Sequence, residues 1–580
     1  MGGGKVDALV PMSNRIQIQQ RPLQQPLAQY AHLGSDTLAR VLSARNVTLE
    51  QLDLQLKHLL QPNLLGLERA VQIIDAAIDS QTHILIVGDY DVDGATSTAL
   101  MILVIRAMGG RIDYIVPDRF KYGYGLTPAI ADLAQKQYAP DLIITVDNGI
   151  SSHAGVTRCH ELGIEVIITD HHLTTKATPD AAAVVNPNQQ GCQFASKALA
   201  GVGVAFYILA RLARHRQQQN KPSVKLSQYL DLVALGTVAD VAQFDFNNRI
   251  LIQAGIERIR QEQCRPAILA LLEISGKNPA QLQAQDFGFV LGPRINAAGR
   301  MDSMRIGIEC LLAEDIASAY PLAYRLDRLN IERRQVEQTM REQAFEILNQ
   351  LALGAQYIAE AIVLFDSSWH QGVIGIVAGR LKEHFHRPSI VFALDEDGIH
   401  LKGSARSILG VHIRDVIEAV AEQYPHLVKF FGGHAAAAGL TIEKQHFDEF
   451  KQRFTEIVAQ HHPSIFTATL LTDGSLSDDE LSLAFLMRLE QFSPYGQGFE
   501  APIFEGVFHL VEHQWLKEQH LKLKLKLTDG RIVEAIGFNY RDKVSTVLSN
   551  QIRLVYSLEK NEFRGEINLQ LKIIHLENVI

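Results

Sequence analysis

Cysteine is scarce in this sequence, which limits the kinds of site that the chain can build. Its 580 residues include only four cysteines, Cys159, Cys192, Cys264 and Cys310, and no two of them form a Cys-x-x-Cys pair. This spacing argues against a thiolate zinc site and fits a reducing compartment. We therefore expect four core thiols.

Long apolar runs are also lacking. The longest uncharged and mostly apolar stretch runs from Ala198 to Ala210 and stops at Arg211, short of the roughly 18 residues that a membrane span needs. We interpret it as a buried helix. The first residues show neither a signal-peptide pattern nor the Ser or Thr of a myristoylation signal. These observations predict a cytoplasmic protein with no membrane partner.

An excess of positive charge, the usual mark of a nucleic-acid-binding protein, is missing too. The formal net charge is −9, from 55 Lys and Arg against 64 Asp and Glu. Net charge is nevertheless a poor guide when acids are concentrated in a metal site and bases lie elsewhere, so local patches must decide. With 47% hydrophobic and 21% charged residues, the composition is that of a globular protein, and the length predicts three or four domains.

Sequence patterns divide the chain into five parts. From His83 onward, β-branched runs at 83–87, 112–116, 142–146, 166–169 and 182–185 alternate with helix-like segments, which predicts a parallel, doubly wound α/β sheet. The stretch 314–350 is rich in Arg, Glu, Gln and Leu without glycine, which predicts a long connecting helix. We expect a flexible or draped, Gln-rich N-terminal arm at 1–35, the sheet domain at 36–313, the helix at 314–350, a smaller α/β domain at 351–462 and a C-terminal module at 463–580.

Three of the predicted strands end in acids. The motifs are Asp89-Tyr90-Asp91-Val92-Asp93-Gly94, Asp147-Asn148-Gly149 and Asp170-His171-His172. In a doubly wound sheet, ligands bind outside the carboxyl ends of the strands, so these side chains should converge. Each motif alone is as well explained by turn formation, but the three together are not.

Crowded carboxylates imply cations. Acids a few ångströms apart resist ionising unless metal ions neutralise them, and a set of carboxylates with imidazole suits Mn²⁺ or Mg²⁺. Asp240 is a further candidate because it follows the apolar segment Leu235 to Ala239, where an unpaired charge would be costly. A surface acid at a helix end is the alternative for Asp240.

The three motifs, followed by Thr237-Val238-Ala239-Asp240, resemble the signature of the DHH phosphoesterase superfamily. The resemblance implies two divalent metal ions, Mn²⁺ or Mg²⁺, and a DHH catalytic domain. It implies metal ligation by Asp91, Asp93, Asp147, His171 and Asp240, with Asp147 bridging the ions, and supporting or catalytic roles for Asp89, Asp170 and His172. Some relatives carry a histidine where this chain has Val87.

Further segments are similar to those of the RecJ-like exonucleases within that superfamily. They are Pro293 to Arg300, Trp369 to Gly375 and Ser493 to Gly498, while Gly432 to Gly439 resembles the glycine-rich signature of the DHH-associated domain. The resemblance implies a DHH-associated domain, a C-terminal OB-type β-barrel and degradation of single-stranded DNA from its 5′ end to 5′ mononucleotides, in recombination and repair. A helicase and a single-strand-binding protein are the expected protein partners, and we expect a monomer.

The candidate substrate-binding residues come from these segments, from Gly403 to Ser407 and from one alternating strand. Ser404 and Arg406 would share one face of a strand as an anion clamp, and the Gly432 to Gly439 segment is either a phosphate-binding turn or a tight helix start. Leucine and lysine alternate through 521–527, which places three lysines on one strand face. The candidates are Arg294, Arg300, Ser404, Arg406, Gly433, His434, Lys522, Lys524 and Lys526.

Two other functions remain open at this point. One is an oligonucleotide or cyclic-dinucleotide phosphodiesterase of the same superfamily, which would lack the OB module. The other is a non-catalytic RecJ-like replication scaffold, which would lack metal ligands. Every acid of the set is present in this sequence.

Overall fold

A computed structural model describes residues 16–117, 125–174, 177–352, 359–541, 547–563 and 565–579. The chain forms two compact units. One consists of Met1–Gln20 with Ile331–Leu471, and the other of Arg21–Asn330 with Thr472–Ile580. The second unit therefore contains both the predicted sheet domain and the C-terminal module.

The predicted doubly wound sheet is confirmed. Its five strands lie in the order β3-β2-β4-β5-β6, and every neighbouring pair is parallel. They are β2 (Ile84–Gly88), β3 (Ile112–Ile115), β4 (Leu142–Val146), β5 (Glu165–Thr169) and β6 (Ala183–Val185). Chain order runs outward from the neighbouring strands β2 and β4 in opposite directions, so the carboxyl ends of these two strands border a topological switch point.

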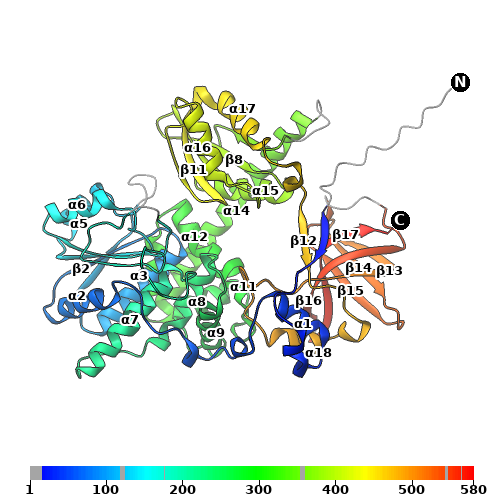
Figure 1. Cartoon of the computed structure of the whole chain (residues 1–580), viewed down its shortest axis with the longest axis horizontal. Helices are drawn as coiled ribbons and strands as arrows, with labels where there is room; N and C mark the ends of the chain where they lie inside the picture. Colours follow the sequence, from blue (N-terminus) through cyan, green and yellow to red (C-terminus); the bar gives the residue numbers. More distant parts are fainter. Residues whose placement is uncertain are drawn as a thin grey trace. The chain divides into compact units, whose positions relative to one another are not determined.

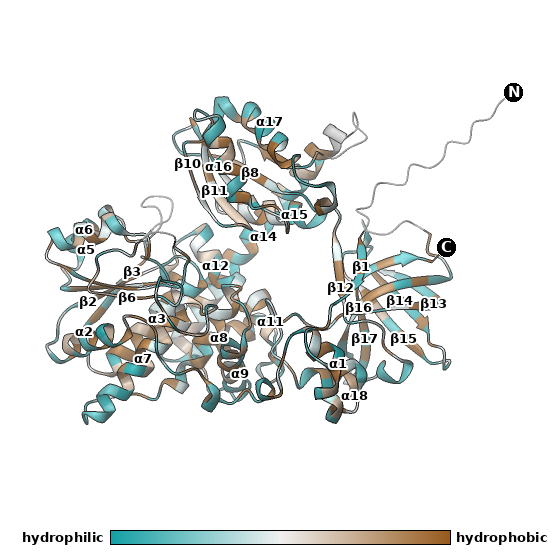
Figure 2. Cartoon of the chain, viewed as in Figure 1, coloured by the Kyte–Doolittle hydropathy of each residue, from teal (hydrophilic) through white to brown (hydrophobic). Residues whose placement is uncertain are grey.

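Helices cover both faces of this sheet (Figure 1). Ile84 and Ile86 of β2 share a core with α2 (Leu67–Asp79), α3 (Val92–Ala107) and α7 (Gly201–Gln218). Leu85 and Val87 point to the opposite side, into a core with α5 (Pro128–Gln137) and α6 (His153–Glu161). Burial on both faces explains why the strands are apolar throughout rather than alternating (Figure 2).

A layer of helices follows the sheet. The stretch from Ala198 to Ala210 lies largely in α7, whose residues are mostly buried, as predicted. The layer contains α8 (Leu230–Ala239), α9 (Phe246–Arg260), α10 (Pro266–Ile274), α11 (Ala284–Asp286), α12 (Gly292–Met301) and α13 (Arg305–Leu312). In the described parts of the chain, no helix has the length and apolar character required to cross a bilayer. All four cysteines are free thiols; Cys159, Cys192 and Cys310 are buried and Cys264 is half-buried.

The connecting helix is confirmed as α14 (Ile316–Ala352), which passes from one unit into the other. A second sheet follows, in the order β10-β11-β9-β8-β7. Its elements are β7 (Ile362–Phe365), α15 (Ile374–Phe385), β8 (Ser389–Leu394), β9 (His400–Arg406), α16 (Ile413–Gln423), β10 (Phe430–Gly433), β11 (Ala437–Glu443) and α17 (Phe447–Val458). Gly432 to Gly439 thus forms a β-hairpin, and the alternative of a tight helix start is wrong.

The C-terminal module contains a closed barrel in the order β13-β14-β15-β17-β16. Its strands are β13 (Phe504–Leu516), β14 (His520–Lys526), β15 (Ile532–Gly537), β16 (Gln551–Phe563) and β17 (Glu566–Asn578). Leu521, Leu523 and Leu525 are fully buried, whereas the lysines between them face outward, as the alternation predicts. Helix α18 (Leu483–Glu490) precedes the barrel, and the Arg488 guanidinium donates to the Leu33 carbonyl just before α1 (Asp36–Ala44).

Of the two alternatives for the N-terminal arm, the draped one is confirmed for residues 17–35, and the flexible one is wrong there. Strand β1 (Gln17–Gln20) pairs with β12 (Thr469–Thr472), and the Tyr30 side chain is completely buried. A glutamine-rich segment can join a sheet because the ladder uses backbone groups rather than side chains. Residues 1–15 lie outside the described residues.

Candidate metal centre

The first acidic motif forms the turn between β2 and α3. Asp91 caps α3, because its carboxylate accepts a hydrogen bond from the Gly94 amide at 3.0 Å. Gly94 has to be glycine, since a Cβ there would lie 2.6 Å from the Asp89 carbonyl oxygen. The tight turn therefore presents Asp89, Asp91 and Asp93 within one short segment.

Asp93 is buried and held by the beginning of α7. Its carboxylate accepts hydrogen bonds from the amides of Gly201 at 2.6 Å and Val202 at 2.8 Å. A Cβ on Gly201 would lie 2.7 Å from the Asp147 Cβ, so only glycine fits. The sequence analysis missed these two residues, although a glycine at the start of an apolar helix was a visible signal for a close approach.

Asp147 follows β4 with a left-handed backbone, at φ 60°. Asp and Asn adopt this conformation more readily than most residues, but it remains uncommon and concentrates at functional sites. The neighbouring Asn148 fixes the turn, because its side-chain amide donates to the carbonyls of Val87 at 3.0 Å and Val146 at 2.8 Å. Asn148 is thus a third residue, after Gly201 and Val202, whose positioning role was not predicted from the sequence.

The Asp-His-His motif is organised by its aspartate. The buried Asp170 carboxylate accepts from the His171 amide at 2.7 Å, the Ile150 amide at 2.9 Å and the His172 ring Nδ1 at 2.7 Å. Asp170 therefore orients the two imidazoles, so its predicted catalytic role is better described as positioning.

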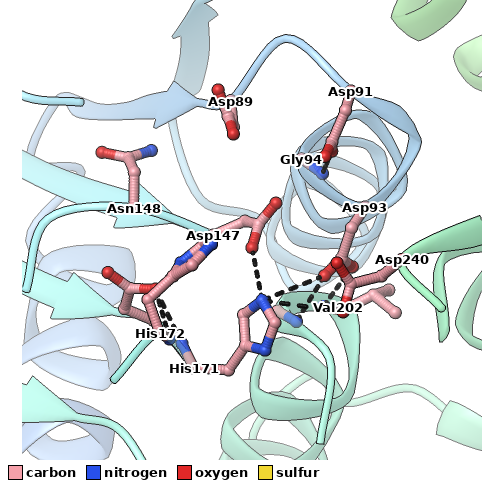
Figure 3. Close-up of polar contacts among 12 residues, drawn as sticks. Asp89, Asp91, Asp93, Gly94, Asp147, Asn148, His171, His172, Val202 and Asp240 are labelled. Carbon is pink, nitrogen blue, oxygen red and sulfur yellow. Dashed lines mark hydrogen bonds and ion pairs between the residues drawn. The ribbon is translucent and has the colours of Figure 1, made fainter. Parts of the chain in front are cut away.

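These side chains and Asp240 converge, as predicted (Figure 3). The His171 Nε2 atom lies 3.1 Å from Asp147 Oδ1, and 3.8 Å from both Asp93 Oδ2 and Asp240 Oδ2. Asp240 comes from the end of α8 rather than from a strand. Its alternative as an isolated surface acid is wrong, because it joins this cluster.

Three groups in the cluster have a spacing that fits metal ligation. They are Asp93 with His171 and Asp240, Asp89 with Asp91 and Asp147, and Asp147 with His171 and His172; within each group the ligand atoms lie within 4.8 Å of one another. Oxygen donors with imidazole nitrogen suit Mn²⁺ or Mg²⁺. The geometry adds Asp89 to the candidate ligands, where the sequence predicted a supporting role.

Crowding and burial shift the carboxyl groups toward their neutral forms. Burial, and after it the charge of Asp91, raises the pKa of Asp93 to about 7. Burial and then neighbouring carboxylates, Asp93 first among them, raise the pKa values of Asp147 and Asp240 well above their usual range. A cluster that resists its own ionisation is stabilised by divalent cations.

The two imidazoles have opposite shifts. Burial lowers the pKa of His171 to about 4, so the ring is neutral at pH 7 and available as a ligand. Burial also opposes charge on His172, but its hydrogen bond to Asp170 and the charge of that carboxylate prevail and raise the pKa of His172 to about 9. In the cluster without cations, His172 is thus the charged ring of the pair at neutral pH.

The two residues of the predicted anion clamp, Ser404 and Arg406, lie side by side in the other unit. On β9, the Arg406 guanidinium donates to Ser404 Oγ at 3.1 Å, and burial lowers the pKa of Arg406. Strand β11 pairs Gly439 with Ser404 and Ala437 with Arg406. A Cβ on Gly375 would lie 2.8 Å from Ser404 Oγ. The segment Trp369 to Gly375, which resembles RecJ-like exonucleases, therefore ends beside Ser404 and Arg406.

Comparison with known proteins establishes the family. Residues 83–237 match the DHH family, N-terminal domain, residues 354–460 the DHHA1 domain, and residues 472–575 the RecJ OB domain. The single-stranded-DNA-specific exonuclease RecJ of Dickeya dadantii is 46% identical over 555 residues, covering 93% of this chain and 95% of the relative. That of Escherichia coli is 44% identical over 578 residues, covering 97% and 99%. The chain belongs to the RecJ family.

Solved RecJ structures agree with this assignment. The crystal structure of RecJ in complex with Mn²⁺ from Thermus thermophilus superposes with a TM-score of 0.83 at 28% identity, covering 98% of this chain and 80% of that chain. The corresponding Mg²⁺ complex gives a TM-score of 0.76 at 27% identity, covering 98% and 79%. The described acids and imidazoles of this chain are positioned to hold the same kind of ion.

Two of the RecJ-like arginines lie on α12 beside the acidic turn. Arg294 forms an ion pair with Asp327 of α14 at 2.9 Å and is only 11% exposed. A Cβ on Gly299 would lie 2.1 Å from the Tyr90 carbonyl oxygen, so this helix packs directly against the acidic turn. The contacts give Arg294 a structural role; substrate binding by Arg294 and by the half-buried Arg300 stays a prediction.

The predicted lysine face of the RecJ OB domain is a mixed-charge surface. Lys522 pairs with Glu534 at 2.8 Å, and Lys524 pairs with Glu512 at 2.8 Å, each across neighbouring strands. The sequence could not reveal these partners because they depend on strand register. Contacts from these lysines, from Lys526, and from Gly433 and His434 of the β10–β11 hairpin, to DNA stay predictions.

Proposed function

We propose that this chain is a metal-dependent exonuclease that hydrolyses single-stranded DNA from the 5′ end and releases 5′ mononucleotides, in DNA recombination and repair. The observation that carries the proposal is the convergence of the candidate metal ligands in a chain of the RecJ family. Asp147 lies close to Asp89 and Asp91 on one side and to His171 on the other. His171 in turn lies close to Asp93 and Asp240.

The residues of the cluster have two proposed roles, which are to hold metal ions and to contact the phosphate. Two divalent ions held there would supply an activated water and stabilise the charge on the leaving oxygen. Asp147 belongs to one group with Asp89 and Asp91 and to another with His171 and His172, which supports a bridging role, and its left-handed backbone orients the carboxylate. The hydrogen bond that the His172 ring makes with Asp170 supports a role for His172 as a donor to a phosphate oxygen.

The polarity of degradation is proposed to depend on Ser404 and Arg406. A terminal phosphate is the feature that distinguishes the end of a strand from its interior, and a guanidinium beside a hydroxyl is suited to bind it. Gly375 lies directly against this pair, since a Cβ there would be 2.8 Å from Ser404 Oγ, and β11 places the small residues Ala437 and Gly439 opposite Arg406 and Ser404.

Digestion of labelled single strands tests the proposal. With Mn²⁺ or Mg²⁺, a strand labelled at its 5′ end should release labelled mononucleotide at once, whereas a 3′-labelled strand should first shorten. Release of label from the 3′ end first, or of internal fragments, would contradict it. A duplex of the same sequence with blunt ends is the control and should resist digestion.

The two other functions receive less support. A phosphodiesterase restricted to short substrates would not need the OB domain that residues 472–575 match. A non-catalytic scaffold would have lost ligands, whereas all the predicted ones converge. We further propose that the protein acts in the cytoplasm as a monomer. Its proposed partners are a helicase and a single-strand-binding protein.

A further inference from the structure

The segment from Ser493 to Gly498 has no part in the chemistry above, yet it contacts the loop that follows Asp240. The Phe244 amide donates to the Gln497 carbonyl at 2.7 Å. The Phe244 ring is buried against Gly496, where a Cβ would lie 2.3 Å from the ring. A backbone turn just before the barrel therefore rests on the loop that begins at a metal-ligand candidate.

The next helix, α9, holds the far side of the same turn. The Arg249 guanidinium lies 3.9 Å from the centroid of the Phe499 ring and donates to the Phe492 carbonyl at 2.9 Å. Tyr495 and Phe499 stack with their ring centroids 5.4 Å apart. Reciprocal hydrogen bonds between the backbones of Gly496 and Phe499, at 2.9 and 3.0 Å, close the turn.

The loop itself contains an unfavourable backbone conformation. Val241, directly after Asp240, has φ 59° although it is β-branched, and its side chain is largely exposed, so its own packing does not compensate. Such a conformation persists only where several surrounding contacts hold the backbone in place. On one side α8 fixes it through the hydrogen bond from the Ala242 amide to the Thr237 carbonyl at 3.3 Å.

On the other side, the loop is fixed by Phe244 and by the cap of α9. Asp245 accepts from the Asn248 amide at 2.8 Å, while Phe244 is held by Gly496 and Gln497. The Asp240 carboxylate has to stay near His171, with 3.8 Å between Oδ2 and Nε2. If Phe244 loses its contacts with Gly496 and Gln497, the Val241 backbone can leave its left-handed conformation. The adjacent Asp240 carboxylate would then move away from His171.

We propose that the turn Gly496–Phe499, hereafter the barrel turn, positions Asp240 for metal binding through Phe244 and Val241. The inference rests on the proposed function in that Asp240 is taken as a ligand. It gives the barrel module a second contribution besides DNA binding. The residues of the barrel turn are positioning residues, since the metal cluster includes none of them.

Calorimetric titration of the metal-free full chain with Mn²⁺ alone tests this inference. Gly496→Ala forces the Phe244 ring away and should weaken Mn²⁺ binding by about 10- to 100-fold, the range found when residues behind metal ligands are replaced. Metal-free binding of single-stranded DNA should stay within about twofold. The matched control is Gly506→Ala, whose Cβ would meet the Phe508 ring at 3.0 Å within the barrel, and it should leave Mn²⁺ affinity unchanged.

A double substitution separates positioning from general destabilisation. Val241→Gly removes the strained side chain, so adding Gly496→Ala to it should cost Mn²⁺ affinity much less than in the parent protein. Gly496→Ala with a lowered melting temperature and unchanged Mn²⁺ affinity would overturn the inference. If that variant does not fold, Phe244→Leu takes its place with the same expected loss. Because Mn²⁺ binding is measured without DNA, failure here is distinguishable from failure of the proposed exonuclease polarity.

Discussion

Asp147→Asn tests two consequences of placing several acids in one site, namely a lower stability without metal and the ability to bind metal ions. Asparagine tolerates the left-handed backbone at this position as well as aspartate does, so the substitution removes charge without adding strain. The metal-free cluster is costly: a pKa of about 7 for Asp93 against an ordinary 3.8 corresponds to about 4 kcal/mol against its ionised form. Ionisation of Asp147 is opposed in the same way, by burial and then by the charges of Asp93 and Asp91, so replacing its carboxyl group by an amide should recover part of the cost of the cluster.

We expect metal-free Asp147→Asn to melt at least about 2 °C higher than the parent protein at pH 8, a shift that corresponds to roughly 1 kcal/mol. A carboxyl group with a raised folded-state pKa contributes stability below its unfolded pKa and loses it as pH rises through the folded value. The gain should therefore shrink toward pH 5, where the clustered acids of the parent protein hold protons. Nuclease activity should fall more than about 100-fold, beyond the loss usual for residues behind a ligand.

Scanning calorimetry with and without Mn²⁺ measures both effects. Mn²⁺ should raise the melting temperature of the parent protein markedly and that of Asp147→Asn little. Asp231→Asn is the control, because Asp231 is a buried carboxyl with a raised pKa that accepts from the Arg265 amide outside the metal cluster. A full Mn²⁺ response in Asp147→Asn, or a lower metal-free melting temperature at pH 8, would refute the reasoning.

Three further outcomes follow from the geometry. Mn²⁺ affinity should rise between pH 6 and 8, by up to about tenfold per pH unit, because binding displaces the proton that Asp93 holds below about pH 7; calorimetry in two buffers would show no proton release if this is incorrect. Arg406→Ala should reduce cleavage of 5′-phosphorylated strands about 10- to 100-fold more than of 5′-hydroxyl strands, and equal losses would assign Arg406 another role. Replacing Lys522, Lys524 and Lys526 by alanine should reduce the salt slope of single-strand binding by about 2 if all three contact phosphates, and by about 0.7 if only one does.

Local sequence was sufficient to predict the sheet and most of the metal cluster. The acids follow strands directly, and the carboxyl ends of parallel strands meet at one edge, so spacing along the chain implied proximity in space. The contacts that hold Asp93 could not be found in this way, because Gly201 lies 108 residues further along the chain. The ion pairs of Lys522 and Lys524 depend on strand register, which the alternation of residues does not specify.

The barrel and the sheet domain form one compact unit, which no pattern in the sequence indicated. A buried ion pair at 2.7 Å joins Arg45 beside α1 to Asp473 before the barrel, with almost no exposure of either side chain. Long-range pairs of this kind have no periodic signal. They also make lysine substitutions a better test of the barrel than truncation, which would leave Arg45 buried without its partner.

The state of the four thiols has a practical consequence for spectroscopy. Burial raises the pKa values of Cys159, Cys264 and Cys310 to about 12, so at pH 8 roughly one such thiol in ten thousand is a reactive thiolate. Cys192 is buried as well. A cysteine introduced on an exposed strand of the barrel should therefore react with a maleimide dye far faster than the native thiols. Fluorophores or spin labels could then follow binding of a single strand without first removing any natural cysteine.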